Sequence, residues 1–137
     1  MIQEDYVTPE IAKLLRQKGF KGDCIMDYID NELINVYDYD YPSMYELENT
    51  GDDVVDAPTL QMAMKWLREV HYLHITVHPG VSEYGFVWTY AIVFAKEAGK
   101  GETHFYKISQ ITTPIVKSKS YEQACEAAIK YCLENLL

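Results

Sequence analysis

Three histidines form the cluster in this chain whose spacing most resembles a metal site. His71, His74 and His78 lie within eight residues, and imidazole is a common zinc ligand. On a strand, His74 and His78 share a face, but positions four apart are separated by about 13 Å. A single ion with bonds of about 2 Å cannot join them. We therefore expect surface histidines on an edge strand, and no metal or other cofactor.

Paired carboxylates are the second group that could do chemistry, through acid-base catalysis or binding of a hard cation. The pairs are Asp38 and Asp40, Glu46 and Glu48, and Asp52 and Asp53. An EF-hand loop that begins at Asp38 would place Pro42 at a ligand position and Ser43 where glycine is needed. These acids are therefore expected to be solvated at the surface.

The three cysteines, Cys24, Cys125 and Cys132, are expected to be reduced thiols. Cys125 and Cys132 lie seven residues apart on a predicted helix, which separates them by about 10.5 Å along its axis. That distance is too long for a disulfide. The chain also has no Gly-x-Ser-x-Gly, Walker loop, dinucleotide fingerprint or Cys-x-x-Cys motif. We therefore predict that the protein is not an enzyme.

Negative charge is concentrated in residues 23–56, which we call the acidic lobe. The lobe carries eleven Asp or Glu and no Lys or Arg, whereas the rest of the chain has ten acids and twelve bases. Its five tyrosines are Tyr28, Tyr37, Tyr39, Tyr41 and Tyr45. Tyrosine supplies contact area, and charge accelerates encounter. The predicted contacts with a basic protein partner are Asp38, Tyr39, Asp40, Tyr41, Tyr45, Asp52 and Asp53.

Other interpretations of the acidic lobe remain open. It could serve only solubility, or it could imitate the charge of nucleic acid and occupy a DNA-handling protein. The net charge of −9 argues against direct binding to nucleic acid or anionic lipid, because both need a basic surface. The last elements are predicted in the order α-β-β-β-α, which is that of a double-stranded RNA binding domain. Such a domain needs basic residues at the start of its last helix, where this chain has SYEQACE.

A single α+β domain is expected to position these residues, given a length of 137. Helices are predicted at Thr8 to Lys18, Thr59 to Val70 and Ser120 to Leu136, where Thr or Ser caps precede apolar residues at helical spacing. A hairpin is expected over residues 24–37 with its turn at Asp30-Asn31, followed by a short helical turn over residues 43–47. The predicted order is α-(ββ)-α-β-β-β-α.

The central strand is predicted at Phe86 to Ala95, within an antiparallel sheet of three or more strands and with helices packed on one face. Phe86, Trp88, Tyr90, Ile92 and Phe94 form its bulky face. Flanking strands are expected at Leu73 to Val77, ended by Pro79-Gly80, and at Thr103 to Ile108, after a turn from Lys96 to Glu102.

The last helix is rich in small residues, so we expect it to pack on the small-residue face of the central strand. Trp88 and Tyr90 would then be left uncovered by the chain and exposed to solvent. An exposed aromatic face of that size predicts a homodimer with Trp88 and Tyr90 at its interface. A structural homo-oligomer without small-molecule chemistry is therefore an alternative function.

Three segments carry a resemblance to known proteins. APTLQMAMKWLRE (residues 57–69), SYEQACEAAIKYCLENL (residues 120–136) and TPEIAKLLRQKGF (residues 8–20) resemble small uncharacterised proteins of phages, prophages and related gut-bacterial genomes. The resemblance implies an accessory protein of a mobile element and brings no catalytic residues. MIQEDYVTPE lacks the features of a signal peptide, and no run of about 18 apolar residues is present, so we expect a cytoplasmic protein.

Overall fold

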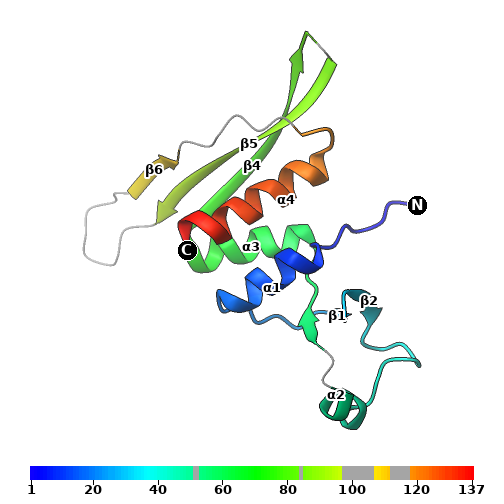
Figure 1. Ribbon diagram of the computed structural model, residues 1–137. Helices are drawn as coiled ribbons and strands as arrows, with labels where there is room; N and C mark the ends of the chain where they lie inside the picture. The colour runs from blue at the N-terminus through cyan, green and yellow to red at the C-terminus, as the bar shows by residue number, and fades with distance from the viewer. Residues whose placement is uncertain (51–52, 84, 97–106, 112–117) are drawn as a thin grey trace.

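The computed structural model describes residues 1–50, 53–83, 85–96, 107–111 and 118–137. Its elements are α1 (Pro9–Gln17), β1 (Met26–Ile29), β2 (Glu32–Asn35), α2 (Met44–Thr50), β3 (Val54–Asp56), α3 (Leu60–His71), β4 (Leu73–Ser82), β5 (Gly85–Lys96), β6 (Lys107–Ile111), α4 (Tyr121–Tyr131) and the π-helical η1 (Cys132–Leu136). Two three-stranded antiparallel sheets, β2-β1-β3 and β4-β5-β6, lie on opposite sides of α1, α3 and α4 (Figure 1). The predicted α+β class is therefore confirmed.

Hydroxyl side chains begin the three long helices at the predicted positions. Thr8, Thr59 and Ser120 have extended backbone, and each side-chain oxygen accepts a hydrogen bond from the backbone N–H three residues later, at 3.3, 3.1 and 3.1 Å. These bonds satisfy amide groups that have no partner within the helix. α4 continues directly into η1, so the chain is helical as far as Leu136.

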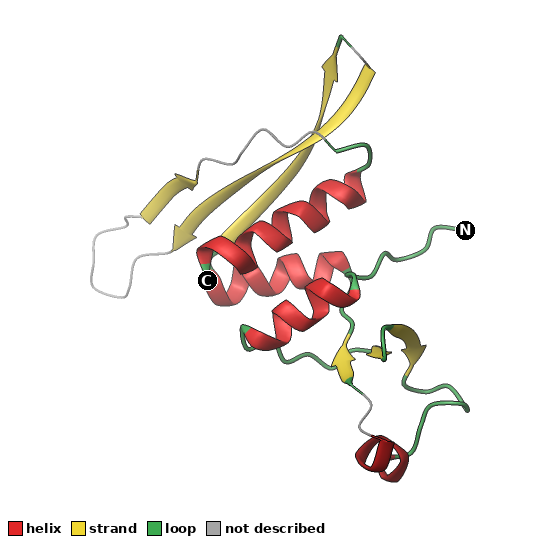
Figure 2. Cartoon of the chain, viewed as in Figure 1, coloured by secondary structure: helices red, strands yellow, loops and turns green. Residues whose placement is uncertain are grey.

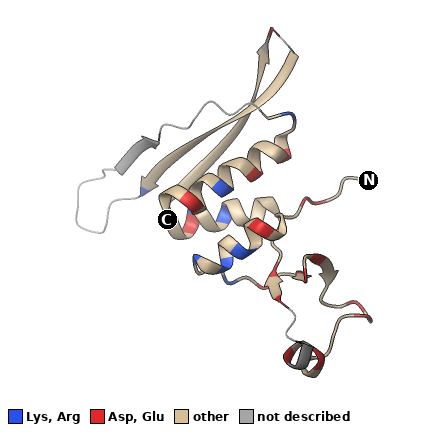
Figure 3. Cartoon of the chain, in the orientation of Figure 1, with Lys and Arg blue, Asp and Glu red and all other residues tan. Residues whose placement is uncertain are grey.

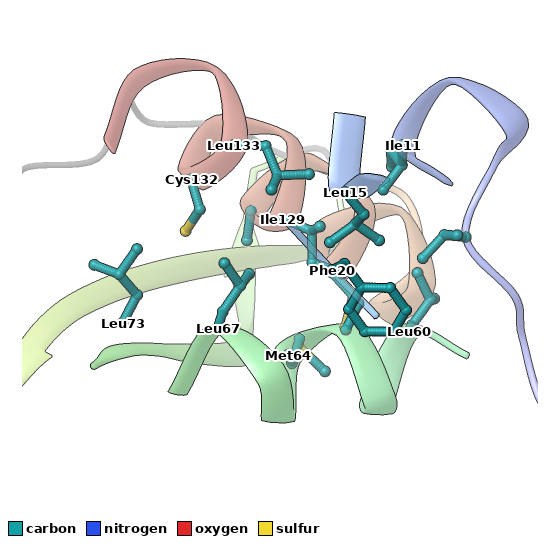
Figure 4. Packing of buried hydrophobic residues seen from close by; sticks show 14 of the residues in the cluster. Ile11, Leu15, Phe20, Leu60, Met64, Leu67, Leu73, Ile129, Cys132 and Leu133 are labelled. Atoms are coloured by element: carbon teal, nitrogen blue, oxygen red, sulfur yellow. The ribbon is translucent and has the colours of Figure 1, made fainter. Parts of the chain in front are cut away.

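The core begins where α3 and α4 cover one face of the larger sheet, and it continues among these helices, η1 and α1 (Figure 4). Its largest fully buried side chains include Leu15, Leu67, Ile92, Ile129 and Leu133. Ala124 and Ala128 on α4 are also fully buried, and small side chains at a contact allow helices to approach their neighbours closely. Each helix therefore depends on the others to bury its apolar face.

β5 is the central strand of the larger sheet, as predicted. Its bulky side chains, however, lie on the face that the helices cover. Tyr90 is 6% exposed and Ile92 is fully buried, while the rings of Trp88 and Tyr121 on α4 meet edge to face at 5.5 Å. The prediction that the last helix packs on the small-residue face is wrong. Larger apolar side chains gain more free energy from burial, which favours the observed orientation.

Coverage by α4 also removes the reason for expecting an oligomer interface at Trp88 and Tyr90. Those residues were predicted to lack a cover within the subunit, but Tyr90 belongs to the buried core and Trp88 is half-buried. Tyr90 is thus not accessible to a second copy, and its assignment as an interface residue is wrong. A homodimer formed in another way stays a prediction.

β4 continues past the point where Pro79-Gly80 was predicted to end it. The strand reaches Ser82, with Pro79 opposite Trp88 of β5. Trp88 directs both of its backbone hydrogen bonds to Ser118, away from β4. Since Pro79 occupies an edge position where β5 needs no N–H donor, its missing hydrogen breaks no bond of the ladder.

The described part of the third strand, β6, differs in position from the prediction. It runs from Lys107, opposite Lys96, to Ile111, opposite Ile92. It therefore extends three residues past the predicted end at Ile108. Residues 103–106, and most of the predicted turn from Lys96 to Glu102, lie outside the described residues.

Candidate protein-binding lobe

The acidic lobe is built on the small sheet β2-β1-β3, at the end of the molecule away from β4 and β5 (Figure 2). Its β1–β2 hairpin turns at Asp30 and Asn31, whose φ angles are 49° and 67°. Asp and Asn tolerate this left-handed conformation, which a tight two-residue turn requires. The predicted hairpin is confirmed. β3, which pairs with the other side of β1, was not predicted from the sequence.

Contacts with α1 and with the chain before it hold the acidic lobe against the helices. Arg16 lies 3.2 Å from the Asp53 carboxylate and donates a hydrogen bond to the Val54 carbonyl oxygen at 3.1 Å. The Tyr28 hydroxyl donates to the Val7 carbonyl oxygen at 2.6 Å. Asp53, which was predicted to contact a partner, is therefore engaged within the chain, where it fixes the start of β3 on α1.

Two carboxyl groups and a tyrosine fix the interior of the lobe. Asp27 and Asp56 are direct cross-strand neighbours, and Asp27 is only 7% exposed. The Tyr41 hydroxyl donates to Asp27 Oδ2 at 2.6 Å, and burial together with this bond raises the pKa of Tyr41 to about 12. Burial, followed by the neighbouring Asp27, also raises the pKa of Asp56. Tyr41, another predicted partner contact, instead holds its loop against the small sheet.

Large side chains close to Tyr41 in the sequence extend into solvent. Tyr37, Tyr39, Met44 and Tyr45 are 83%, 100%, 77% and 75% exposed. Ser43 and Glu46 exchange hydrogen bonds of 3.1 and 3.2 Å that start α2, as in a capping box. Tyr39 and Tyr45 were predicted contacts, whereas Tyr37 and Met44 were missed, although Tyr37 begins the alternation of tyrosine and acid.

The exposed aromatic side chains lie within an acidic surface. Asp38 and Asp40 are exposed, and neither forms an ion pair with any residue in the described ranges. No Lys or Arg occurs between Lys21 and Lys65, and the lobe shows no basic residue in Figure 3. Asp52, the remaining predicted contact, lies outside the described residues.

The cysteine and histidine side chains that could do chemistry are packed into the fold or lie on β4. Burial raises the pKa of the Cys132 thiol to about 12, which opposes formation of the reactive thiolate. The His71 ring packs edge to face on Trp66 at 4.6 Å. His74 and His78 share a face of β4, as predicted. Across the part of the chain that the structure describes, no three His, Cys, Asp or Glu side chains are grouped to hold a metal ion.

No protein-family model, curated protein or solved structure matches the chain. Within the described ranges, each helix is too short or too polar to cross a membrane.

Proposed function

We propose that the protein is a non-enzymatic interaction module that binds a basic protein partner through the acidic lobe. The observation that carries this proposal is the exposure of four large side chains, Tyr37, Tyr39, Met44 and Tyr45, within nine residues of an acidic surface. Exposed apolar patches rimmed by polar groups are typical of interaction sites. Tyr and Met are also enriched in protein interfaces.

The framework beneath the exposed side chains supports a docking role. The Tyr41–Asp27 bond and the Arg16–Asp53 pair order the lobe within the free protein. A pre-ordered loop loses less conformational entropy on binding, so more of the contact energy appears as affinity. The acidic charge would attract a basic partner and raise the association rate.

The resemblance to phage and prophage proteins supports an accessory role for a mobile element, carried out in the cytoplasm. Imitation of nucleic-acid charge is one form of the same docking, in which the partner is a DNA-handling protein. In that form, duplex DNA would compete with the acidic lobe for the partner.

A quantitative pull-down from a lysate of the source organism tests the proposal with two matched variants. Asp38→Asn/Asp40→Asn removes two exposed charges from the lobe, and Glu4→Gln/Glu83→Gln removes two exposed charges elsewhere. We expect a basic partner that the second variant retains and the first variant loses.

The purified partner then allows a kinetic measurement. Its association rate should fall as salt shortens the Debye length from about 10 Å at 0.1 M to about 3 Å at 1 M. Equal association rates for wild type and Asp38→Asn/Asp40→Asn in low salt would exclude the acidic lobe as the docking site.

A further inference from the structure

The outer edge of the larger sheet is unpaired among the described residues. β4 has β5 on one side and no described strand on the other. Trp88 exchanges two backbone hydrogen bonds of 2.9 Å with Ser118, on the β6 side of β5. Because ladder bonds alternate along a strand, Pro79 opposite Trp88 directs its backbone away from β5. By the same alternation, Ile75 and Val77 direct their N–H and C=O groups to the open edge.

Residues 73–78 of this edge lack the devices that normally protect an edge strand. Natural edges are blunted by charged side chains, prolines or bulges. Residues 73–78 contain no charged residue and no proline, and the register with β5 is continuous from Leu73 to Ser82. Pro79 removes an N–H donor only after that segment. Within the described ranges, no strand pairs with the backbone groups of Ile75 and Val77, which leaves them available to another strand.

Apolar side chains along the same edge are incompletely covered. Ile75 and Val77 pack against the core but are only half-buried. A further strand beside β4 would place cross-strand neighbours next to them, and such pairs stabilise a sheet.

We propose that two copies of this chain pair through β4, antiparallel about a two-fold axis at Thr76. This axis places Ile75 of one copy opposite Val77 of the other, so that each such pair exchanges two backbone hydrogen bonds. Thr76 then lies opposite Thr76 of the second copy. The β4-β5-β6 sheets of the two copies become one continuous six-stranded sheet. The region in which both backbone groups can bond ends at Pro79 of each copy.

Charge identifies the occupant of this edge as a second copy. The chain has a net charge of −9, yet residues 73–82 contain no Asp, Glu, Lys or Arg. Like-charged molecules meet with least repulsion along a neutral strand, whereas a basic partner gains no attraction there. An antiparallel strand pair is also self-complementary under a two-fold axis, as a symmetric dimer requires.

Sedimentation velocity over micromolar to millimolar concentrations tests this pairing. Wild type should dimerise, and Thr76→Glu should weaken dimerisation at least tenfold because it places two carboxylates opposite each other. Thr76 is exposed in the subunit, so the substitution should leave the melting temperature nearly unchanged. Thr76→Val keeps the branched shape without charge and should dimerise like wild type, as should Asp38→Asn/Asp40→Asn.

Amide hydrogen exchange supplies a second readout that needs no substitution. The N–H groups of Ile75 and Val77 should exchange more slowly as the protein concentration rises. The N–H of His78, which points to β5, should be protected at every concentration. A monomer across the whole range, a dimer unaffected by Thr76→Glu, or concentration-independent exchange at Ile75 and Val77 would each overturn the proposal.

Discussion

Replacing Tyr41 with Phe removes one hydroxyl and tests whether its bond to Asp27 stabilises the acidic lobe. The bond is 2.6 Å long, and its acceptor belongs to a side chain that is almost fully buried. Hydrogen bonds to charged groups contribute roughly 1.5–3 kcal/mol. We expect Tyr41→Phe to lower the free energy of unfolding by about 2 kcal/mol. For a domain of this size, that loss corresponds to a melting temperature lower by about 6–8 °C.

Urea denaturation followed by circular dichroism measures this loss, and the chain contains a matched control. Tyr39 lies two residues away and is fully exposed, so Tyr39→Phe should change stability by less than about 0.5 kcal/mol. A double-mutant cycle with Asp27→Asn isolates the pair, with an expected coupling of about 1 kcal/mol or more. Equal effects of Tyr41→Phe and Tyr39→Phe would refute the role given to the bond.

The pH dependence of the same bond has a definite sign. The folded-state pKa of Tyr41 is raised to about 12 from the ordinary value of 10.0. Its stabilisation is thus fully present below pH 10.0 and is lost as pH rises through about 12. In a near-ultraviolet absorbance titration, Tyr41→Phe should have one late-ionising phenol fewer than wild type, whereas Tyr39→Phe should keep the wild-type number.

Ala128→Asp should unfold the protein, because Ala128 is fully buried and an unpaired buried carboxylate costs several kcal/mol out of a total of about 5–15. A melting curve equal to wild type would contradict the placement of α4. Asp56→Asn should stabilise the protein near neutral pH but not below pH 3.8. Because the folded-state pKa of Asp56 is raised, its protonated form contributes stability that is present below pH 3.8 and is lost as pH rises through the folded-state pKa. Denaturant titrations at both pH values measure this difference, and equal shifts would count against it. His71→Phe keeps a ring against Trp66 and removes the buried Nε2, which has no hydrogen-bond partner among the described residues. The free energy of unfolding in urea should rise by about 1 kcal/mol, and a fall would contradict this prediction.

Local signals explain which elements were predictable. The cap at Thr59 and the turn at Asp30-Asn31 depend on residues that are close together in the sequence, so the sequence alone predicts them. β3, by contrast, has only three residues and pairs with β1, which is distant in the sequence. Its short apolar pair, Val54-Val55, therefore gives no distinctive pattern.

Tertiary contacts explain the errors. Both faces of β5 are apolar, so periodicity indicates a central strand but does not reveal which face the helices cover. Tyr39 and Tyr41 have the same chemistry and alternate with the same acids, and both were predicted as partner contacts. The structure separates their roles because Asp27, fourteen residues before Tyr41, accepts a hydrogen bond from the Tyr41 hydroxyl. A distant acceptor of this kind leaves no local mark in the sequence.

The chain enters the acidic lobe through β1 and leaves it through the neighbouring β3, where the Ala57 N–H bonds to the Met26 carbonyl oxygen at 3.0 Å. The two ends of the segment between β2 and β3, residues 36–53, are thus held by one small sheet. The exposed tips of such a segment tolerate change without displacing the elements that carry it. Under the proposed docking role, substitution of its exposed side chains would change the binding preference, while α1, α3, α4 and the larger sheet keep the buried contacts of the core.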